Sequence, residues 1–179
     1  MEFAAEPWDY LAASDAIDIE HPLVQSIASD LRTGDDIAYA HAAFDHVRDR
    51  VAHSMDAGDP RVPWRASDVL EQGVGLCYAK SHAYVALLRA GGVQAGLCYQ
   101  TVSGVLHGLT AVLVDDRWVR LDPRGNNADV DVDFSPSEDR LAYPDVPVHP
   151  VVYATPHPTV LGALRAMRTL DPQALPAAL

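Results

Sequence analysis

The segment from Cys77 to Ala90, CYAKSHAYVALLRA, constrains the fold of this chain more than any other feature. It predicts a helix that is apolar on nearly every side, and Gly91-Gly92 provides its end. A helix of this kind is usually central and covered by other elements. We therefore expect the rest of the chain to enclose this segment.

The surrounding segments predict an α+β fold, in which helices come first, an antiparallel meander follows, and a helix ends the chain. A helix is expected from Asp36 to His53, capped by Thr33 or Asp35, because apolar residues recur there at spacings of three and four. Residues 1–179 are expected to form one domain, with residues 1–15 either loosely ordered or wrapped on the surface. The other expected elements are a short helix capped by Ser67 and closed by Gly73, strands at 93–102, 108–114 and 117–122, short strands at 16–20, 129–134 and 149–155, and a helix over 159–170 capped by Thr159.

The charge of the chain excludes several classes of partner. The formal net charge is −12, and Lys80 is the only lysine among 13 basic residues. The arginines are scattered, so we expect neither nucleic acid nor a membrane surface as a partner. The first 20 residues lack a basic region followed by an apolar one. This pattern predicts no signal peptide and favours a cytoplasmic location. The oligomeric state stays open.

Two cysteines, Cys77 and Cys98, are too few for a disulfide framework. Cys77 lies at the predicted start of the central helix, where unpaired N–H groups and the helix dipole favour a thiolate. It is therefore a candidate nucleophile, and the alternative is a small buried residue. Lys80, one turn further along, either adds positive charge near Cys77 or is an ordinary solvated lysine. Cys98 lies in the middle of a predicted strand and is expected to serve packing alone.

A nucleophilic cysteine also needs a base, and the base needs a group that orients it. Among the eight histidines, His107 stands out because it opens the strand HGLTAVLV, and the next strand, RWVRLDP, ends with Asp122. A two-residue hairpin turn at 115–116 would place His107 and Asp122 on the same face as diagonal neighbours, about 7–8 Å apart by backbone. A three-residue turn would instead place them on opposite faces. The pair is therefore a candidate base with its orienting carboxylate.

The runs ASDVLEQGVGLCYAKSHAYVALLRAGGVQAGLCYQ (66–100) and HGLTAVLVDDRWVRLDPRGNN (107–127) resemble the transglutaminase-like superfamily. The shared pattern has a glycine shortly before a cysteine at a helix start, a histidine that opens a strand, and an aspartate followed by proline one hairpin later. Cys77, His107 and Asp122-Pro123 match these elements in order. The run VRDRVAHS (47–54) resembles bacterial members more weakly.

The resemblance implies a papain-like core, in which the cysteine-bearing helix packs on an antiparallel sheet. It also implies a Cys–His–Asp triad of Cys77, His107 and Asp122, with no metal and no organic cofactor. The implied chemistry is acyl transfer through a thioester on the cysteine. Where many members carry an aromatic residue soon after the histidine, this chain has Gly108-Leu109.

The resemblance further implies two donors to the oxyanion of the reaction, the backbone N–H of the cysteine and an upstream polar side chain. Trp64 and Gln72 are the candidates for the second donor, and the alternatives are a packed loop aromatic and an exposed glutamine. Arg124 and Lys80 are candidates for binding substrate, Arg124 through a substrate carboxylate.

One further motif is discounted. The run DVDVDF (129–134) resembles the start of a calcium loop, but Phe134 and Arg140 stand where that loop requires glycine and glutamate. A strand or a solvated acidic face is expected there.

These observations predict an enzyme that cleaves or transfers an amide or peptide acyl group through a thioester on Cys77. The expected partner is a peptide, a protein or a small amide, and hydrolysis is favoured over crosslinking. Two alternatives stay open. One is a non-catalytic module that binds protein or peptide on the same fold, and the other is an acyltransferase that acts on a small amine.

Overall fold

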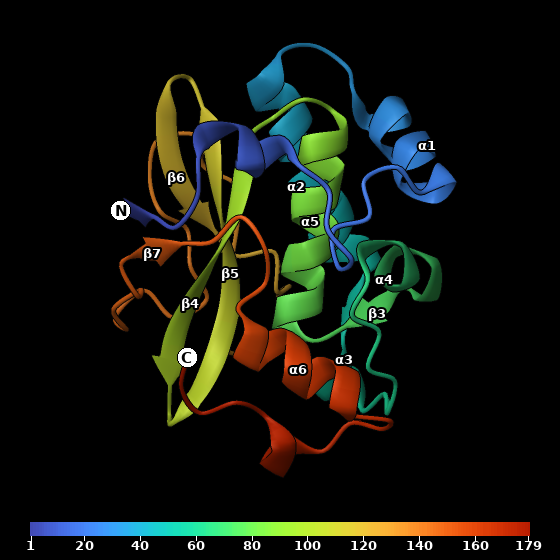
Figure 1. Ribbon diagram of the computed structural model, residues 1–179, viewed down its shortest axis with the longest axis vertical. Helices are drawn as coiled ribbons and strands as arrows, with labels where there is room; N and C mark the ends of the chain where they lie inside the picture. Colours follow the sequence, from blue (N-terminus) through green and yellow to red (C-terminus); the bar gives the residue numbers. More distant parts are fainter.

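The computed structural model describes residues 1–179, and helix α5 (Cys77–Ala90) runs through its centre (Figure 1). Every residue of α5 from Cys77 to Arg89 is buried. The predicted bounds and central position of α5 are confirmed, as is the α+β class. Each fully buried leucine or valine in such a helix contributes about 1.5–3 kcal/mol to stability. The three-stranded sheet covers one side of α5, and the other side is covered by α1 (Pro22–Leu31), α2 (Asp36–Arg50) and α4 (Ala66–Gln72).

The sheet is an antiparallel meander of β4 (Ala95–Val102), β5 (Val105–Val114) and β6 (Arg117–Leu121). Asp115 and Asp116 form the two-residue turn between β5 and β6, with φ angles of 51° and 58°. A turn of this kind needs positive φ at both positions, which aspartate tolerates better than most residues. The predicted hairpin register is therefore confirmed.

Residues 1–11 pack near the sheet, and residues 13–15 lie beside Asp18 and Arg65. Strand β1 (Glu2–Phe3) pairs in parallel with β7 (Val151–Val152), which lies within the segment expected as a strand at 149–155. The 3-10 helix η1 (Pro7–Leu11) buries Tyr10, whose hydroxyl donates to the Val152 carbonyl at 2.8 Å. The N-terminal residues are thus held by contacts with the C-terminal half of the chain.

Two of the expected short strands are wrong. At 16–20 the chain turns instead, because Ser14 and Ile17 exchange backbone hydrogen bonds and Ile17 enters the main core. At 129–134 the side-chain oxygens of Asn126 and Asn127 accept from backbone N–H groups of the segment, which leaves it no strand partner. Local side-chain acceptors compete with strand pairing in this way.

The helices before α5 differ from prediction at their ends. Helix α1 was not predicted. Helix α2 begins as expected with Asp35 as its cap, since Asp35 Oδ1 accepts from the Ala38 N–H at 2.8 Å. It ends at Arg50 rather than His53, because Ala52–His53 form strand β2, which pairs in parallel with β3 (Val74–Gly75). This pairing brings His53 beside the approach to Cys77.

Two predicted caps are wrong as well. Ser67 lies inside α4, and its N–H and hydroxyl donate to Asp18 at 3.0 and 2.5 Å. Helix α6 (Pro158–Ala166) is capped by His157, whose Nδ1 accepts from the Thr159 N–H at 3.3 Å. Gly73 does close α4, with φ of 63°. The remaining short helices are α3 (Ser54–Ala57) and η2 (Pro172–Ala174), and no helix of the chain has the length and apolar run needed to cross a membrane.

Candidate active site

Cys77 is the first residue of α5, and its sulfur faces strand β5. No side chain caps this end of the helix, so the first-turn N–H groups and the positive end of the helix dipole remain available near the thiol. The Gly108 N–H donates to Cys77 Sγ at 3.5 Å. A Cβ on Gly108 would lie 2.8–2.9 Å from Tyr78 atoms, so only glycine allows the helix to approach the strand this closely. The close packing of Tyr78 therefore explains why this chain has Gly108 directly after the histidine, where an aromatic residue is often found soon after it.

His107 and Asp122 meet as their strand positions predict. His107 Nε2 lies 2.6 Å from Asp122 Oδ2, and Asp122 is fully buried. The backbone N–H groups of Arg124 and Ala142 also donate to the Asp122 carboxylate, each at 3.1 Å. Burial by itself would raise the pKa of Asp122, but His107 and these N–H groups lower it below its ordinary value. Asp122 is therefore an ionised acceptor that fixes the His107 ring.

Cys77 and His107 form a coupled pair. Burial acts to raise the pKa of Cys77, but the charge and hydrogen bond of His107, with a contribution from His53, lower it to about 6. Burial acts to lower the pKa of His107, whereas Asp122 and Cys77 raise it well above its ordinary value. Because Nε2 is engaged with Asp122, Nδ1 is the ring nitrogen left for Cys77. At neutral pH the favoured state is a thiolate beside an imidazolium.

His53 also lies beside Cys77, and the sequence interpretation missed it. Strand pairing sets His53 opposite Gly75, two residues before Cys77. The His53 side chain is nearly buried and lines the same cleft as Cys77. Its Nδ1 lies 3.7 Å from Asp56 Oδ1 and makes no hydrogen bond. The signal that could have found it is the H-x-x-D spacing of His53 and Asp56 in the run VAHSMD.

The expectations for Lys80 are corrected by its position. Lys80 is fully buried, and its amine donates to the Val51 carbonyl and, at 3.3 Å, to the Arg48 carbonyl. Burial lowers the pKa of Lys80 to about 7. The amine therefore caps the C-terminal end of α2 and supports the turn that leads to His53. Lys80 is neither a solvated lysine nor part of the cleft around Cys77.

Arg124 does line the cleft, but its guanidinium already has a partner. Both terminal nitrogens contact the Asp56 carboxylate at 2.9 Å. Asn127 Nδ2 donates to the same carboxylate at 2.9 Å. Asp56 thus joins the His53 side of the site to the segment that follows Asp122. Binding of a substrate carboxylate by Arg124 would have to compete with this ion pair.

The structure does not bring the two predicted oxyanion donors to Cys77. Gln72 is exposed, and neither Gln72 nor Trp64 lines the cleft. The guanidinium groups of Arg65 and Arg165 stack on the ring of Trp64. The Trp64 carbonyl accepts a hydrogen bond from His82 Nδ1 at 2.8 Å. Trp64 is therefore a packed aromatic residue and Gln72 an exposed glutamine, as the alternative interpretations of the sequence state.

The cleft itself has a volume of about 300 Å³. A second cavity of about 540 Å³ adjoins it and shares His53, Asp56 and Arg124. The cleft is the cavity that contains the Cys77 thiol, and most of its lining is apolar. The apolar wall of the cleft consists mainly of Met55, Leu76, Tyr78, Val102, Val105, Leu106, Tyr143 and Leu175.

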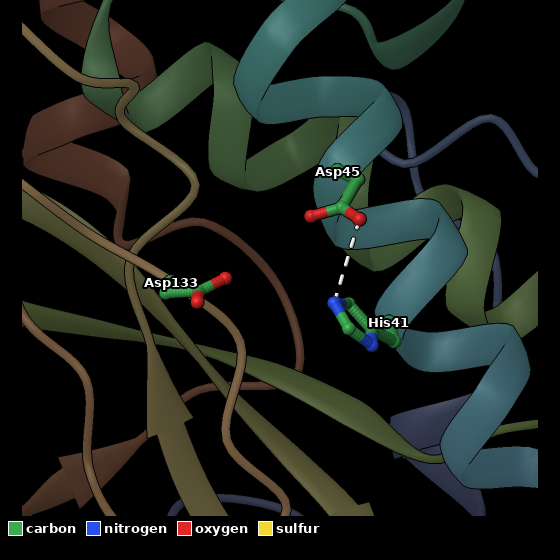
Figure 2. Close-up of side chains that lie close together, drawn as sticks. All are labelled: His41, Asp45 and Asp133. Atoms are coloured by element: carbon green, nitrogen blue, oxygen red, sulfur yellow. Dashed lines mark ion pairs between the residues drawn. The ribbon is translucent and has the colours of Figure 1, made fainter.

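One group of side chains has the composition of a metal site (Figure 2). His41 and Asp45 from α2 approach Asp133, and their potential ligand atoms lie within 4.8 Å of one another. Arg48 already pairs with both carboxylates, at 3.1 Å in each case. The His41 ring stacks on Phe134 at 4.8 Å between centroids. These contacts explain the group as an ion-pair network that fastens the 129–134 segment to α2.

The sequence model of a protein family, the transglutaminase-like superfamily, matches residues 25–123, which is more than half of the chain. Among solved structures, a candidate cysteine protease from Cytophaga hutchinsonii matches with a TM-score of 0.57 and 17% identity, over 66% of this chain and 42% of that one. The periplasmic domain of TgpA from Pseudomonas aeruginosa matches with a TM-score of 0.49 and 17% identity, over 67% and 48%. The chain thus spans less than half of the length of these structures. Comparison with curated proteins gives no match.

Proposed function

Because this chain belongs to the transglutaminase-like superfamily, we propose that it is a thiol-dependent acyl-transfer enzyme. Cys77 is the nucleophile, His107 moves the proton, and Asp122 orients His107. The observation that carries this proposal is the buried 2.6 Å contact between His107 and Asp122, set beside a thiol at a helix start. A pKa of about 6 for Cys77 supports the enzyme over a module that only binds.

The reaction proceeds in two steps. The Cys77 thiolate attacks the carbonyl carbon, a C–S bond forms, and the carbonyl π electrons move to oxygen. The C–N bond then breaks as the His107 imidazolium gives its proton to the leaving amine, which leaves a thioester. Water, or a second amine, loses a proton to His107 and attacks the thioester carbonyl. The C–S bond breaks, and the thiolate is restored beside a protonated His107.

In each tetrahedral intermediate the former carbonyl oxygen carries a negative charge, and hydrogen-bond donors must stabilise it. The Cys77 backbone N–H, at the uncapped start of α5, is one. We assign the second donor to the His53 side chain, which lines the cleft together with Cys77 and is set opposite Gly75 by strand pairing. The contribution of His53 to the lowered pKa of Cys77 supports this role, because it places the His53 ring within reach of the sulfur.

An amide with an apolar acyl group is the preferred substrate class, since most of the cleft lining is apolar. Hydrolysis is favoured over transfer to an amine because water needs no second binding site. The ratio of the two products with and without a small amine, such as hydroxylamine, separates the two outcomes.

The test is direct capture of the thioester. The chain is incubated with N-blocked peptide coumarin amides that carry an aliphatic residue at the scissile bond. Coumarin release is followed by fluorescence, and acid-quenched samples are analysed by intact mass and peptide mapping. We expect an acyl adduct on Cys77 that accumulates with the release, while Cys98→Ala behaves as the unaltered chain. Release that persists in Cys77→Ala, or the absence of any adduct across the peptide set, contradicts the proposal.

A further inference from the structure

Strand β5 has no strand partner along one edge beside the thiol, which we call the open edge. The Leu106 carbonyl on this edge accepts from the Tyr78 hydroxyl. Strand β6 pairs with β5 only from Thr110 onward, so residues 105–109 have a strand partner on the β4 side alone. The Leu113 N–H donates to the carbonyl of Gln94, the residue before β4, so it points to the β4 side. The direction of the N–H groups alternates along a strand. The N–H groups of Leu106 and Gly108 therefore point to the open edge. The Gly108 N–H meets Cys77 Sγ, as described above.

The other N–H on this edge binds the chain's own C-terminal segment. The Leu106 N–H donates to the Pro176 carbonyl at 2.8 Å. Pro176 is buried, and the preceding Leu175 lines the cleft together with Val102 and Val105. An extended segment thus lies in the cleft with one main-chain hydrogen bond to the strand and one aliphatic side chain against its apolar wall. A main-chain hydrogen bond with a neighbouring side chain in an apolar pocket is the elementary contact of a peptide that adds to a sheet edge.

The distance from this contact to the thiol fits a peptide substrate. Leu106 and Gly108 are two residues apart, which is about 6.6–6.8 Å along a strand. A segment that binds the Leu106 N–H therefore places a residue about two positions away at the level of Gly108 and Cys77 Sγ. In the C-terminal segment the bound carbonyl is that of Pro176. It lies at Leu106, and the next N–H on this edge, that of Gly108, contacts the sulfur.

We infer that the open edge of β5 at Leu106 is the main-chain subsite for substrate, which is an extended peptide with an aliphatic side chain in the place of Leu175. This inference rests on the proposed function and names its substrate class. Residues 175–176 occupy the subsite in this structure, so a substrate must displace them. One main-chain hydrogen bond, the half-buried Leu175 side chain and the buried Pro176 hold them there, and these few contacts make the displacement feasible.

The experiment measures binding without chemistry, on the 179-residue chain carrying Cys77→Ser. Amide hydrogen exchange at Leu106 is followed by NMR in this chain and in a chain that carries Leu175→Asp as a second substitution. We expect exchange at Leu106 to become roughly tenfold faster once the C-terminal segment leaves. Leu179→Asp is the matched control, because Leu179 is exposed, lies in the same segment and does not line the cleft. It is expected to leave exchange at Leu106 unchanged.

A peptide with the sequence of residues 173–179, blocked at both ends, is then titrated into the Leu175→Asp chain. It is expected to restore protection of the Leu106 amide and to shift the Leu106 and Gly108 resonances. The same peptide carrying the Leu175→Asp change is expected to do neither. Unchanged exchange in Leu175→Asp, or equal effects of the two peptides, overturns the inference. If Leu175→Asp unfolds the chain, the two peptides are compared on Leu175→Ala with the same criteria.

Failure of this inference and failure of the proposed function give different results. The Cys77→Ser chain performs no thiol chemistry, so peptide binding is read independently of the triad. An active thiol with no binding at the β5 edge leaves the proposed function intact. Binding at the edge with no thioester on Cys77 leaves only a peptide-binding surface.

Discussion

Cys77 and Cys98 are both buried thiols, yet their surroundings give them opposite chemistry. Cys98 lies in the middle of β4, in a small apolar cluster with Tyr10 and Leu109, and burial raises its pKa to about 12. Burial acts on Cys77 in the same direction, but the pKa of Cys77 falls to about 6 because His107 lies beside it. Burial alone therefore makes a cysteine inert. We propose that reactivity at Cys77 comes from a histidine that a buried carboxylate keeps charged, beside a helix start that lacks a cap.

Removal of the thiol is expected to have the largest effect and breaks the comparison outright. Cys77→Ser should lower kcat/KM for peptide coumarin amides on the order of 10⁶-fold, because hydroxyl ionisation is far less favourable than thiol ionisation. Cys98→Ala should leave kcat/KM unchanged, since Cys98 lies outside the cleft. Steady-state kinetics on both variants measures this. Similar losses in the two variants would place the two cysteines in one functional class.

Loss of the buried carboxylate charge should bring the surroundings of Cys77 closer to those of Cys98. Asp122→Asn keeps the side-chain volume but removes the charge that orients and stabilises the protonated His107. We expect kcat/KM to fall by about 10⁴-fold. Asp139→Asn is the control, because Asp139 pairs with Arg120 on the exposed side of β6. Equal activity in Asp122→Asn and the unaltered chain would mean that Asp122 has no part in catalysis.

The second histidine beside Cys77 sharpens the comparison, because Cys98 has no counterpart to it. His53→Ala should lower kcat by about 10²–10³-fold with little change in KM, as expected for loss of an oxyanion donor. His53→Gln keeps a donor and should recover part of that loss. His46→Ala serves as the control on a nearby histidine outside the cleft. A change in KM alone would assign His53 to substrate binding instead.

The close contact between α5 and β5 is the packing feature that places Cys77. Gly108→Ala should force Tyr78 away from the strand and lower the free energy of unfolding by about 1–3 kcal/mol. Urea unfolding measures this change, and kcat/KM should fall as Cys77 moves. Gly162→Ala lies in α6 with open space around it and should stabilise the chain slightly. A Gly108→Ala chain with full stability and activity would show that the contact can relax at no cost.

Features within one helix or one hairpin could be predicted from the sequence. The bounds of α5 follow from a segment that is apolar on nearly every side and from the glycines after it. The meeting of His107 and Asp122 follows from the length of one turn, since residues on adjacent strands share faces by simple alternation. Both predictions depend only on residues close together in the chain.

Features that depend on distant segments could not be predicted. Asp18 receives the Ser67 donors across the chain, and β2 exists only because β3 lies beside it. The position of His53 depends on that pairing, and a single sequence does not specify which short segments pair. Trp64 and Gln72 are upstream of Cys77 in the sequence, as a second donor should be, but whether a residue lines the cleft depends on which way its side chain points. The contact of Pro176 with Leu106 is of the same long-range kind.

The most direct test of the central claim is the pH dependence of Cys77 alkylation by iodoacetamide, with sites resolved by mass spectrometry. Only the thiolate reacts, so the rate rises with pH through the pKa of the thiol. We predict a midpoint near pH 6 for Cys77, and a midpoint in His107→Ala at or above that of a free thiol, about 8.5. A midpoint near 8.5 in the unaltered chain, or one that His107→Ala does not move, would contradict the account.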